Sequence, residues 1–225
     1  MVRFRDRTDA GRQLAAALAA VAGERPVVLA LPRGGVPVAF EVARALHAPL
    51  DLLLVRKIGA PGHPEYALGA VVDGKNPRLV LNDEAMAAVR PPPGYLEAEK
   101  RRQVAEIERR RQLYLDARQA IPIPDRTVIV VDDGIATGST VKVALQALRK
   151  DGAARIILAV PVAPAEVLGV LRGETDAIIC LSTPQPFHAV GLYYDDFEQV
   201  GDDMVIRLLR EAGAHMGGRE GGGRK

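Results

Sequence analysis

Disulfides and cysteine-rich metal sites are the first features that the composition excludes. The 225-residue chain has one cysteine and no tryptophan, and only 4% of its residues are aromatic. A single thiol cannot form an intrachain disulfide, and the place of Cys180 in the apolar run Ala177–Leu181 is typical of a buried, unreactive cysteine. The core must therefore be built from aliphatic side chains.

Long apolar runs and a strong net charge are also missing. No stretch approaches the roughly 20 apolar residues that span a bilayer, so we expect no membrane contact and a reducing, cytoplasmic setting. The formal net charge of +2 is too small to indicate nucleic acid as the main partner. The glycine-rich end, residues 216–225, is expected to be a disordered tail after a single domain of residues 1–215.

Apolar strands and amphipathic helices alternate along the chain. A Gly- and Pro-rich loop is expected over Arg56–Glu65. The predicted helices are Asp9–Val21 with Thr8 as N-cap, Pro37–Leu46, Glu84–Val89, Tyr95–Gln119, Ser139–Lys150, Ala165–Leu171 and Asp203–Ala212. The predicted strands are Val27–Leu31, Leu50–Val55, Ala67–Val72, Arg78–Leu81, Thr127–Val131, Arg155–Val160 and Asp176–Leu181.

This order predicts an α/β fold with a mostly parallel sheet and helices on both faces. Continuously apolar strands are typical of sheets that are covered on both sides. In such sheets ligands bind beyond the carboxyl ends of the strands. The unusual loops all follow strands, so their residues should converge on one edge of the sheet.

The most informative segment is Val128–Thr140, an apolar strand followed by two acids, a small loop and a helix. The loop and the helix N-terminus can present backbone N–H groups, hydroxyls and a partial positive charge to a phosphate. No lysine stands at the loop, and the glycines are too close for a nucleoside-triphosphate P-loop. The segment therefore favours a single phosphate.

Asp132 and Asp133 directly precede this cradle. Carboxylates repel a phosphate unless they meet hydroxyls or a cation. They can accept hydrogen bonds from the two vicinal hydroxyls of a ribose, or help to hold Mg²⁺ through water. The alternative is an ordinary strand-to-helix turn in which the acids and hydroxyls are only caps.

The segment resembles the phosphoribosyl-pyrophosphate signature of type I phosphoribosyltransferases, in which two acids and a loop ending Thr-Gly-x-Thr follow a strand. The resemblance implies that Asp132 and Asp133 are catalytic, bind the ribose hydroxyls and help to hold Mg²⁺. It also implies a set of residues around the 5-phosphate, namely Ala136, Thr137, Gly138, Ser139 and Thr140.

Two further loops resemble parts of the same family. Pro32–Gly35 is similar to the pyrophosphate loop, which implies that Arg33, Gly34 and Gly35 bind the leaving group. Lys57 stands where the family has a lysine after the second core strand, which implies that Lys57 is catalytic and contacts the pyrophosphate. The stretch Arg56–Glu65 is thereby expected to be a mobile catalytic loop that closes over the site.

The segment Pro186–Phe197 is similar to the base-binding hood of the family, which we place at residues 182–200. Val190, Gly191 and Asp195 fit the hood's spacing. The resemblance implies that Phe187 or Tyr193 stacks on the base and that Asp195 reaches a second Mg²⁺. Residues 82–120 have no counterpart in compact members. An uncharacterised bacterial branch carries this helical insertion, which is expected to be a lid or the arm of a homodimer.

The implied reaction is Mg²⁺-dependent transfer of a phosphoribosyl group from 5-phosphoribosyl-1-pyrophosphate to a nitrogenous base or amine, with release of pyrophosphate. One position departs from the purine-using members. Ala136 stands where many of them have an aspartate that handles a base proton. Either the acceptor needs no such group, or Asp195 or His188 replaces it, or the chain is a non-catalytic sensor of the same ligand.

Overall fold

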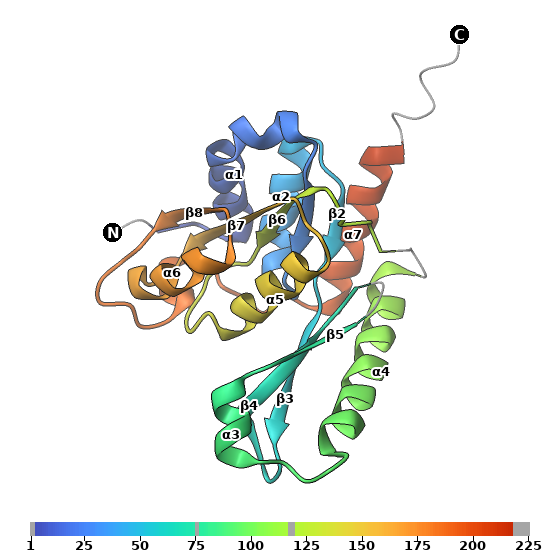
Figure 1. Ribbon diagram of the computed structural model, residues 1–225. Helices are drawn as coiled ribbons and strands as arrows, with labels where there is room; N and C mark the ends of the chain where they lie inside the picture. Colours follow the sequence, from blue (N-terminus) through green and yellow to red (C-terminus); the bar gives the residue numbers. More distant parts are fainter. Residues whose placement is uncertain (1–2, 75–76, 117–119, 218–225) are drawn as a thin grey trace.

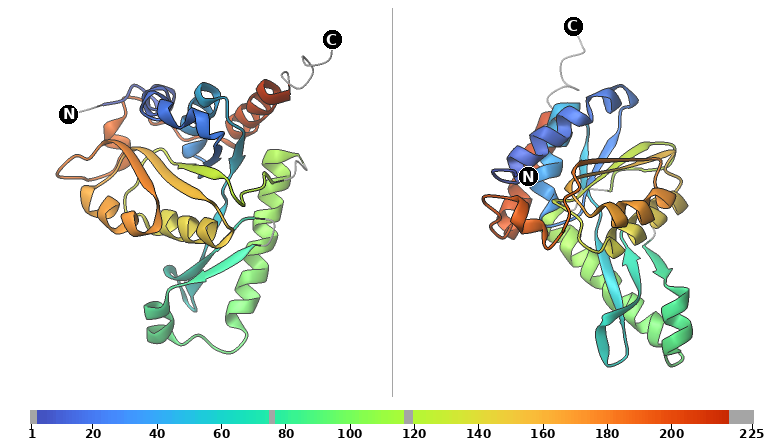
Figure 2. Two further views of the ribbon diagram at one scale, coloured as in Figure 1. Left: turned by 45° about the horizontal axis from the view of Figure 1, so that its top comes forward. Right: turned by 90° about the vertical axis from the view of Figure 1, so that its left-hand side faces the viewer.

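A main α/β body and a smaller lobe make up the protein (Figure 1). The computed structural model describes residues 3–74, 77–116 and 120–217. The body is built on a five-stranded sheet and the lobe on a three-stranded one. Figure 2 shows that the first and last helices both belong to the body, while the middle of the chain forms the lobe.

The body's sheet is parallel throughout, in the order β2-β1-β6-β7-β8. Helices lie on both of its faces, and the predicted fold class is confirmed. The strands are β1 (Val27–Ala30), β2 (Leu50–Leu52), β3 (Val55–Ala60), β4 (His63–Val72), β5 (Arg78–Leu81), β6 (Thr127–Val131), β7 (Arg155–Val162) and β8 (Ala177–Ser182). The α-helices are α1 (Arg7–Ala17), α2 (Gly35–Leu46), α3 (Asp83–Val89), α4 (Tyr95–Leu115), α5 (Ser139–Lys150), α6 (Ala165–Leu171) and α7 (Asp202–Gly217), and the short 3-10 helices are η1 (Ala19–Glu24), η2 (Arg172–Glu174) and η3 (Val190–Tyr193).

Alternate residues of each strand feed two separate aliphatic cores. Val28 and Ile129 belong to the core that includes α1, α2 and α7. Their neighbours Leu29 and Val130 belong to the core that includes α5 and α6. Because successive side chains of a strand point to opposite faces, both faces are covered, and this is why the strands read as unbroken apolar runs.

The lobe corrects one prediction about the chain. Residues 56–65 do not form a loop, because they make up the turn end of an antiparallel hairpin between β3 and β4. Ile58 and Ala60 are buried while Lys57 is exposed, and this alternation is hidden in the sequence by the glycines and prolines around it. The single strand predicted over Leu50–Val55 is likewise divided, since β2 ends at Leu52 and Val55 begins β3.

Helices α3 and α4 pack beside the hairpin. The lobe therefore consists of strands β3, β4 and β5 together with helices from the insertion expected at residues 82–120. Helix α4 runs from the lobe back to the body, where its last turns contact α7 (Figure 1). The helix ends at Leu115, and residues 117–119, which we had predicted to be helical, lie outside the described residues.

The ends of two helices also differ from prediction. Asp6, not Thr8, caps α1, because its Oδ1 accepts a hydrogen bond of 2.7 Å from the Asp9 backbone. Helix α7 continues to Gly217, so residues 216 and 217 are helical; one internal glycine, Gly213, costs a helix only about 1 kcal/mol. The rest of the predicted tail, residues 218–225, lies outside the described residues. Among the described helices none is long and apolar enough to cross a membrane.

Candidate functional site

The loop after β6 lies at the middle of the sheet's carboxyl edge. Strand β6 pairs with β1 on one side and β7 on the other, so its loop is flanked by the loops that follow those strands. The Ile135 backbone N–H donates to the Val162 carbonyl at the end of β7 over 2.9 Å. A Cβ at Gly134 would lie 2.5 Å from a methyl group of Val190 in the hood. The loop is therefore fixed by β7 and covered by the hood.

The end of this loop leaves its polar groups available. Gly138 has φ +73°, a conformation that favours glycine, and directly precedes α5. Within the described residues, no group accepts a hydrogen bond from the backbone N–H of Ala136, Thr137 or Ser139. The hydroxyl oxygens of Thr137 and Ser139 lie 3.4 Å apart, and both side chains are exposed. Free donors at the N-terminus of a 12-residue helix suit an anion.

The loop after β1 reaches the two acids of the β6 loop. A Cβ at Gly34 would lie 2.0 Å from Asp133 Oδ2. A Cβ at Gly35 would lie 2.7 Å from the Val131 carbonyl oxygen and 3.0 Å from the Cα of Asp132. Glycine is therefore required at both positions by the close approach of the neighbouring loop. The adjoining Pro32–Arg33 peptide is cis.

The two acids are in different electrostatic surroundings. Burial, and then the neighbouring Asp133 carboxylate, raise the pKa of Asp132 well above its usual value. Asp132 Oδ1 accepts a hydrogen bond of 2.9 Å from the Asp133 backbone N–H. Asp133 itself forms an ion pair. The charge of Asp133 is therefore balanced by a cation, whereas Asp132 has only a backbone N–H as its partner.

Arg7 is the cation, and sequence reasoning did not find it. Its Nε lies 2.8 Å from Asp133 Oδ2, and the two side chains are 11% and 14% exposed. Its Nη1 donates to the Glu198 carbonyl over 2.7 Å, and its guanidinium lies 3.8 Å from the centroid of the Phe197 ring. Arg7 is 126 residues away from Asp133, and no motif in the chain links the two positions.

We expect Arg7→Gln to destabilise the fold by about 3 kcal/mol, because it leaves a mostly buried carboxylate without its partner. The free energy of unfolding from urea denaturation would measure this. Arg5→Gln is the matched control, since the ion pair of Arg5 with Asp9 spans 3.8 Å and the Arg5 side chain is 76% exposed. A loss no larger than the control's would contradict a structural role for the Arg7 ion pair.

The two basic residues expected at the leaving group lie on opposite sides of the interface between body and lobe. Arg33 forms an ion pair with Asp202 at the start of α7, with 3.3 Å between Nη1 and Oδ1. Lys57 is exposed on β3 and lines a cavity of about 390 Å³ between the lobe and α5. Ser139 and Thr140 line the same cavity, so the structure brings Lys57 and the start of α5 together.

The hood separates the residues that were predicted for the base and a second metal. Tyr193 is only 2% exposed and stacks on Phe187, with 5.4 Å between ring centroids. Phe187 is half-buried, so it is the ring with surface left for a ligand. Asp195 forms an exposed ion pair with Arg3. Among the described residues no three acidic, histidine or cysteine side chains are grouped as a metal site, so Asp195 does not join Asp132 and Asp133.

The parallel sheet covered on both faces, with paired acids and a small-residue loop after its central strand, defines a type I phosphoribosyltransferase-like α/β fold. The chain belongs to the family of the phosphoribosyl transferase domain, whose model matches residues 5–195.

Relatives and a solved structure agree with this membership. The chain is 47% identical over 212 residues to "Putative phosphoribosyl transferase MT0597" of Mycobacterium tuberculosis strain CDC 1551 / Oshkosh and to "Putative phosphoribosyl transferase Rv0571c" of strain H37Rv. Each alignment covers 94% of this chain and 47% of the relative, so the chain spans about half the length of these relatives.

The crystal structure of TT1426 from Thermus thermophilus is similar over 93% of this chain and 99% of that chain, with a TM-score of 0.81 and 47% identity. Because so little of the chain is left uncovered, the lobe cannot be peculiar to this protein.

Proposed function

We propose that the protein binds 5-phosphoribosyl-1-pyrophosphate and transfers its phosphoribosyl group to a nitrogenous base or amine, releasing pyrophosphate. One observation carries the proposal. The loop after β1 lies against the paired acids of β6 so closely that glycine is required at Gly34 and Gly35. The backbone N–H groups of Ala136, Thr137 and Ser139 have no protein acceptor within the described residues. A ligand with a phosphate, a diol and a second anionic group suits that arrangement.

Each part of the site has a separate task in this reaction. The phosphate loop and the start of α5 bind the 5-phosphate through backbone N–H groups and the hydroxyls of Ser139 and Thr140. Asp132 and Asp133 accept hydrogen bonds from the ribose hydroxyls. Arg33 and Lys57 contact the pyrophosphate and stabilise the negative charge that it gains as the bond to C1 breaks. Binding energy from the remote phosphate thereby orients the reacting carbon.

The paired acids also fit a magnesium ion. Mg²⁺ is usually held by one or two carboxylates, with water and substrate phosphates supplying the remaining oxygens, and the two adjacent carboxylates of the β6 loop are a donor set of that kind. When bound, the ion would neutralise charge on the pyrophosphate.

Ala136 makes non-catalytic sensing the second candidate function. Its exposed methyl group stands in the loop at the position where many purine-using members of the family have an aspartate, and it cannot move a proton. An acceptor that is an amine, or a base with an acidic N–H, needs no such group. A protein that only senses the ligand needs none either.

Incubation with the sugar pyrophosphate, Mg²⁺ and a panel of bases and amines, with detection of released pyrophosphate, separates the two functions. Transfer predicts pyrophosphate release that depends on one class of acceptor. Calorimetry on the same protein shows whether the ligand binds. Binding without release for every acceptor tried would favour the sensor, and no binding would overturn both functions.

A further inference from the structure

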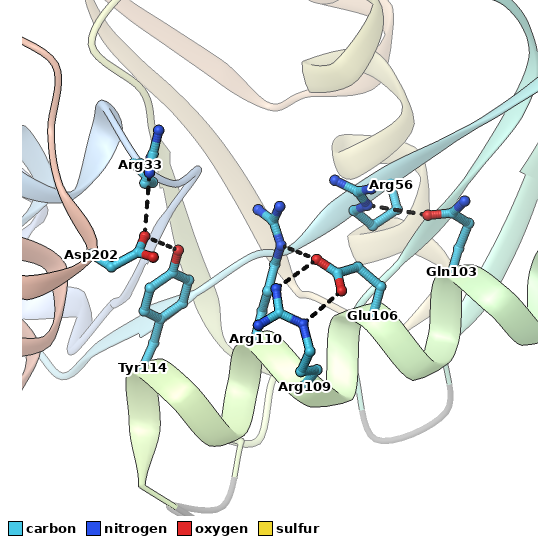
Figure 3. A network of polar contacts seen from close by, with 8 residues as sticks. All are labelled: Arg33, Arg56, Gln103, Glu106, Arg109, Arg110, Tyr114 and Asp202. Atoms are coloured by element: carbon cyan, nitrogen blue, oxygen red, sulfur yellow. Dashed lines mark hydrogen bonds and ion pairs between the residues drawn. The ribbon is translucent and has the colours of Figure 1, made fainter. Parts of the chain in front are cut away.

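Helix α4 presents one side to the interior of the molecule and the other to solvent. Gln103, Ile107 and Tyr114 are buried on its inner side. Arg109 is 61% exposed and pairs with Glu106 within the helix. Figure 3 shows the helix passing below Arg56 and carrying Tyr114 near its end, with the Tyr114 side chain pointing toward Asp202 and Arg33 lying beyond Asp202. The inner side of α4 is therefore linked to two of the segments that we assign to the pyrophosphate, directly to the one that carries Arg56 and through Asp202 to Arg33.

At its last turn, α4 joins a chain of contacts that ends on Arg33. The Tyr114 hydroxyl donates to Asp202 Oδ1 over 2.7 Å, and Arg33 Nη1 lies 3.3 Å from the same oxygen (Figure 3). Tyr114 is 4% exposed, so its ring cannot move freely. Tyr114 lies on α4, Asp202 at the start of α7 and Arg33 in the loop after β1. Three separate parts of the chain thus meet at one carboxylate oxygen.

The contact leaves Arg33 able to bind a ligand. Only Nη1 is engaged, and within the described residues no other acceptor takes a hydrogen bond from this side chain. Hydrogen bonds from Tyr114 and then from Arg33 lower the pKa of Asp202, although partial burial opposes them. The carboxylate is therefore charged at neutral pH and can hold one end of the guanidinium while the other nitrogens remain available.

A purely structural role explains these contacts poorly. The side chains of Arg33 and Asp202 are 36% and 45% exposed, and ion pairs of that exposure contribute little to stability. The same pair fixes the direction of a long, flexible side chain next to Gly34. Arginine binds phosphate well when its planar group is already oriented.

We propose that Tyr114 and Asp202 are positioning residues that hold Arg33 for the pyrophosphate group of the substrate, so that helix α4 completes the pyrophosphate side of the site. The inference rests on the proposed function, because it needs Arg33 to meet pyrophosphate. A second contact from the same helix acts on the other basic segment. Gln103, which is 6% exposed, accepts a hydrogen bond of 3.1 Å from Arg56 Nε, directly before Lys57.

Calorimetric titration with two ligands tests the proposal on the full chain. Pyrophosphate with Mg²⁺ reports on Arg33, whereas ribose 5-phosphate binds the phosphate loop and lacks the leaving group. We expect Tyr114→Phe to weaken pyrophosphate binding about fivefold, because it removes one hydrogen bond. Asp202→Ala should weaken it about tenfold, because it removes a hydrogen bond to a charged group. Ribose 5-phosphate affinity should change less than about twofold in both variants, a split that a general loss of structure would not give.

Three further variants make the result decisive. Asp203→Ala changes the neighbouring exposed acid of α7 and should leave both affinities unchanged. Tyr95→Phe removes a different tyrosine hydroxyl from α4, one that donates to the Gly59 carbonyl over 2.8 Å. This variant should also leave both affinities unchanged. In an Arg33→Gln background, Asp202→Ala should have no further effect, because the two residues act as one unit.

Several results would overturn the proposal. Unchanged or tighter pyrophosphate binding in Tyr114→Phe and Asp202→Ala would show that the contacts do not orient Arg33. Equal losses for both ligands in Asp202→Ala would indicate a disturbed fold. The outcome would then depend on Tyr114→Phe, which removes a single oxygen, and equal losses for both ligands in that variant would also overturn the proposal. Failure of the unaltered protein to bind either ligand would instead refute the proposed function itself.

Discussion

Asp132→Asn combined with Asp133→Asn is expected to abolish the thermal stabilisation that 5-phosphoribosyl-1-pyrophosphate gives to the protein. A ligand at 100 times its Kd stabilises the folded state by about 2.7 kcal/mol. For a chain of this size, that raises Tm by about 5–10 °C. The amide groups keep the shape of the side chains but carry no negative charge, and one oxygen of each carboxyl group is replaced by an NH₂ donor. Each side chain is then a weaker acceptor for the ribose diol and a poor ligand for Mg²⁺.

The readout has to be the shift in Tm caused by the ligand, not Tm itself. Asp133→Asn alone weakens the partner of Arg7, whose Nε lies 2.8 Å from Asp133 Oδ2, so the variant should melt earlier even without ligand. Asp203→Asn, at an exposed acid of α7, is the control and should keep the full shift. If the ligand stabilised the double variant as much as the unaltered protein, the two acids would not bind the ribose.

Gly34→Ala is expected to weaken binding of the same ligand by about 100-fold, although it adds only a methyl group. Gly34 has φ −59°, so alanine meets no backbone strain there, and the effect is purely steric. The new Cβ would lie 2.0 Å from Asp133 Oδ2 and 2.6 Å from its Cγ. The acid must turn away, and in doing so it loses Arg7 and its place beside the ribose. Overpacking of this kind also destabilises a fold, by about 1–3 kcal/mol.

Gly169→Ala is the matched control for this change. Gly169 lies inside α6, and a Cβ there would meet nothing within 4 Å. Alanine favours a helix over glycine by about 1 kcal/mol, so the control should stabilise the protein and leave ligand affinity unchanged. Titration calorimetry gives the ligand affinity of the two variants, and urea denaturation gives their free energy of unfolding. If Gly34→Ala bound the ligand as tightly as Gly169→Ala does, the contact between the two loops would have no role in binding.

Strands and helices with strong local signals could be predicted from the sequence. The bounds of β6, α5 and α6 agree with those expected, because each apolar run is closed by a clear stop, such as Asp132 after β6 and Asp151–Gly152 after α5. The order of the elements was then enough to predict a parallel sheet whose loops lie at one edge. The loop before α5 and the paired acids could be predicted as a candidate site because they are contiguous in the chain.

Features that depend on distant segments could not be predicted in this way. Arg7 reaches Asp133 only because α1 packs on α2 and the segment before α1 is held to the hood, where the Phe4 backbone N–H donates to the Tyr193 carbonyl. The hairpin of β3 and β4 is a further example. Its register is irregular around Gly59, where a Cβ would lie 2.4 Å from the Pro64 carbonyl oxygen. A glycine and a proline that usually indicate a loop here permit a close pairing of strands.

The contacts between Tyr114, Asp202 and Arg33 belong to the same class. They join residues 169 and 88 positions apart, and none of the three stands in a motif that includes the others. Sequence reasoning therefore left α4 as a lid or a dimer arm. In the structure its inner side packs against β3 and is linked to Arg33 through Asp202 of α7, and these are the residues proposed to flank the leaving group.

A crystal structure of the protein with 5-phosphoribosyl-1-pyrophosphate and Mg²⁺ is the most direct measurement of the central claim. The account predicts the 5-phosphate against the backbone N–H groups of residues 136–140, with the ribose hydroxyls on Asp132 and Asp133 and the pyrophosphate beside Arg33. A ligand bound elsewhere, or with its pyrophosphate in the loop before α5 and its ribose away from the acids, would contradict it.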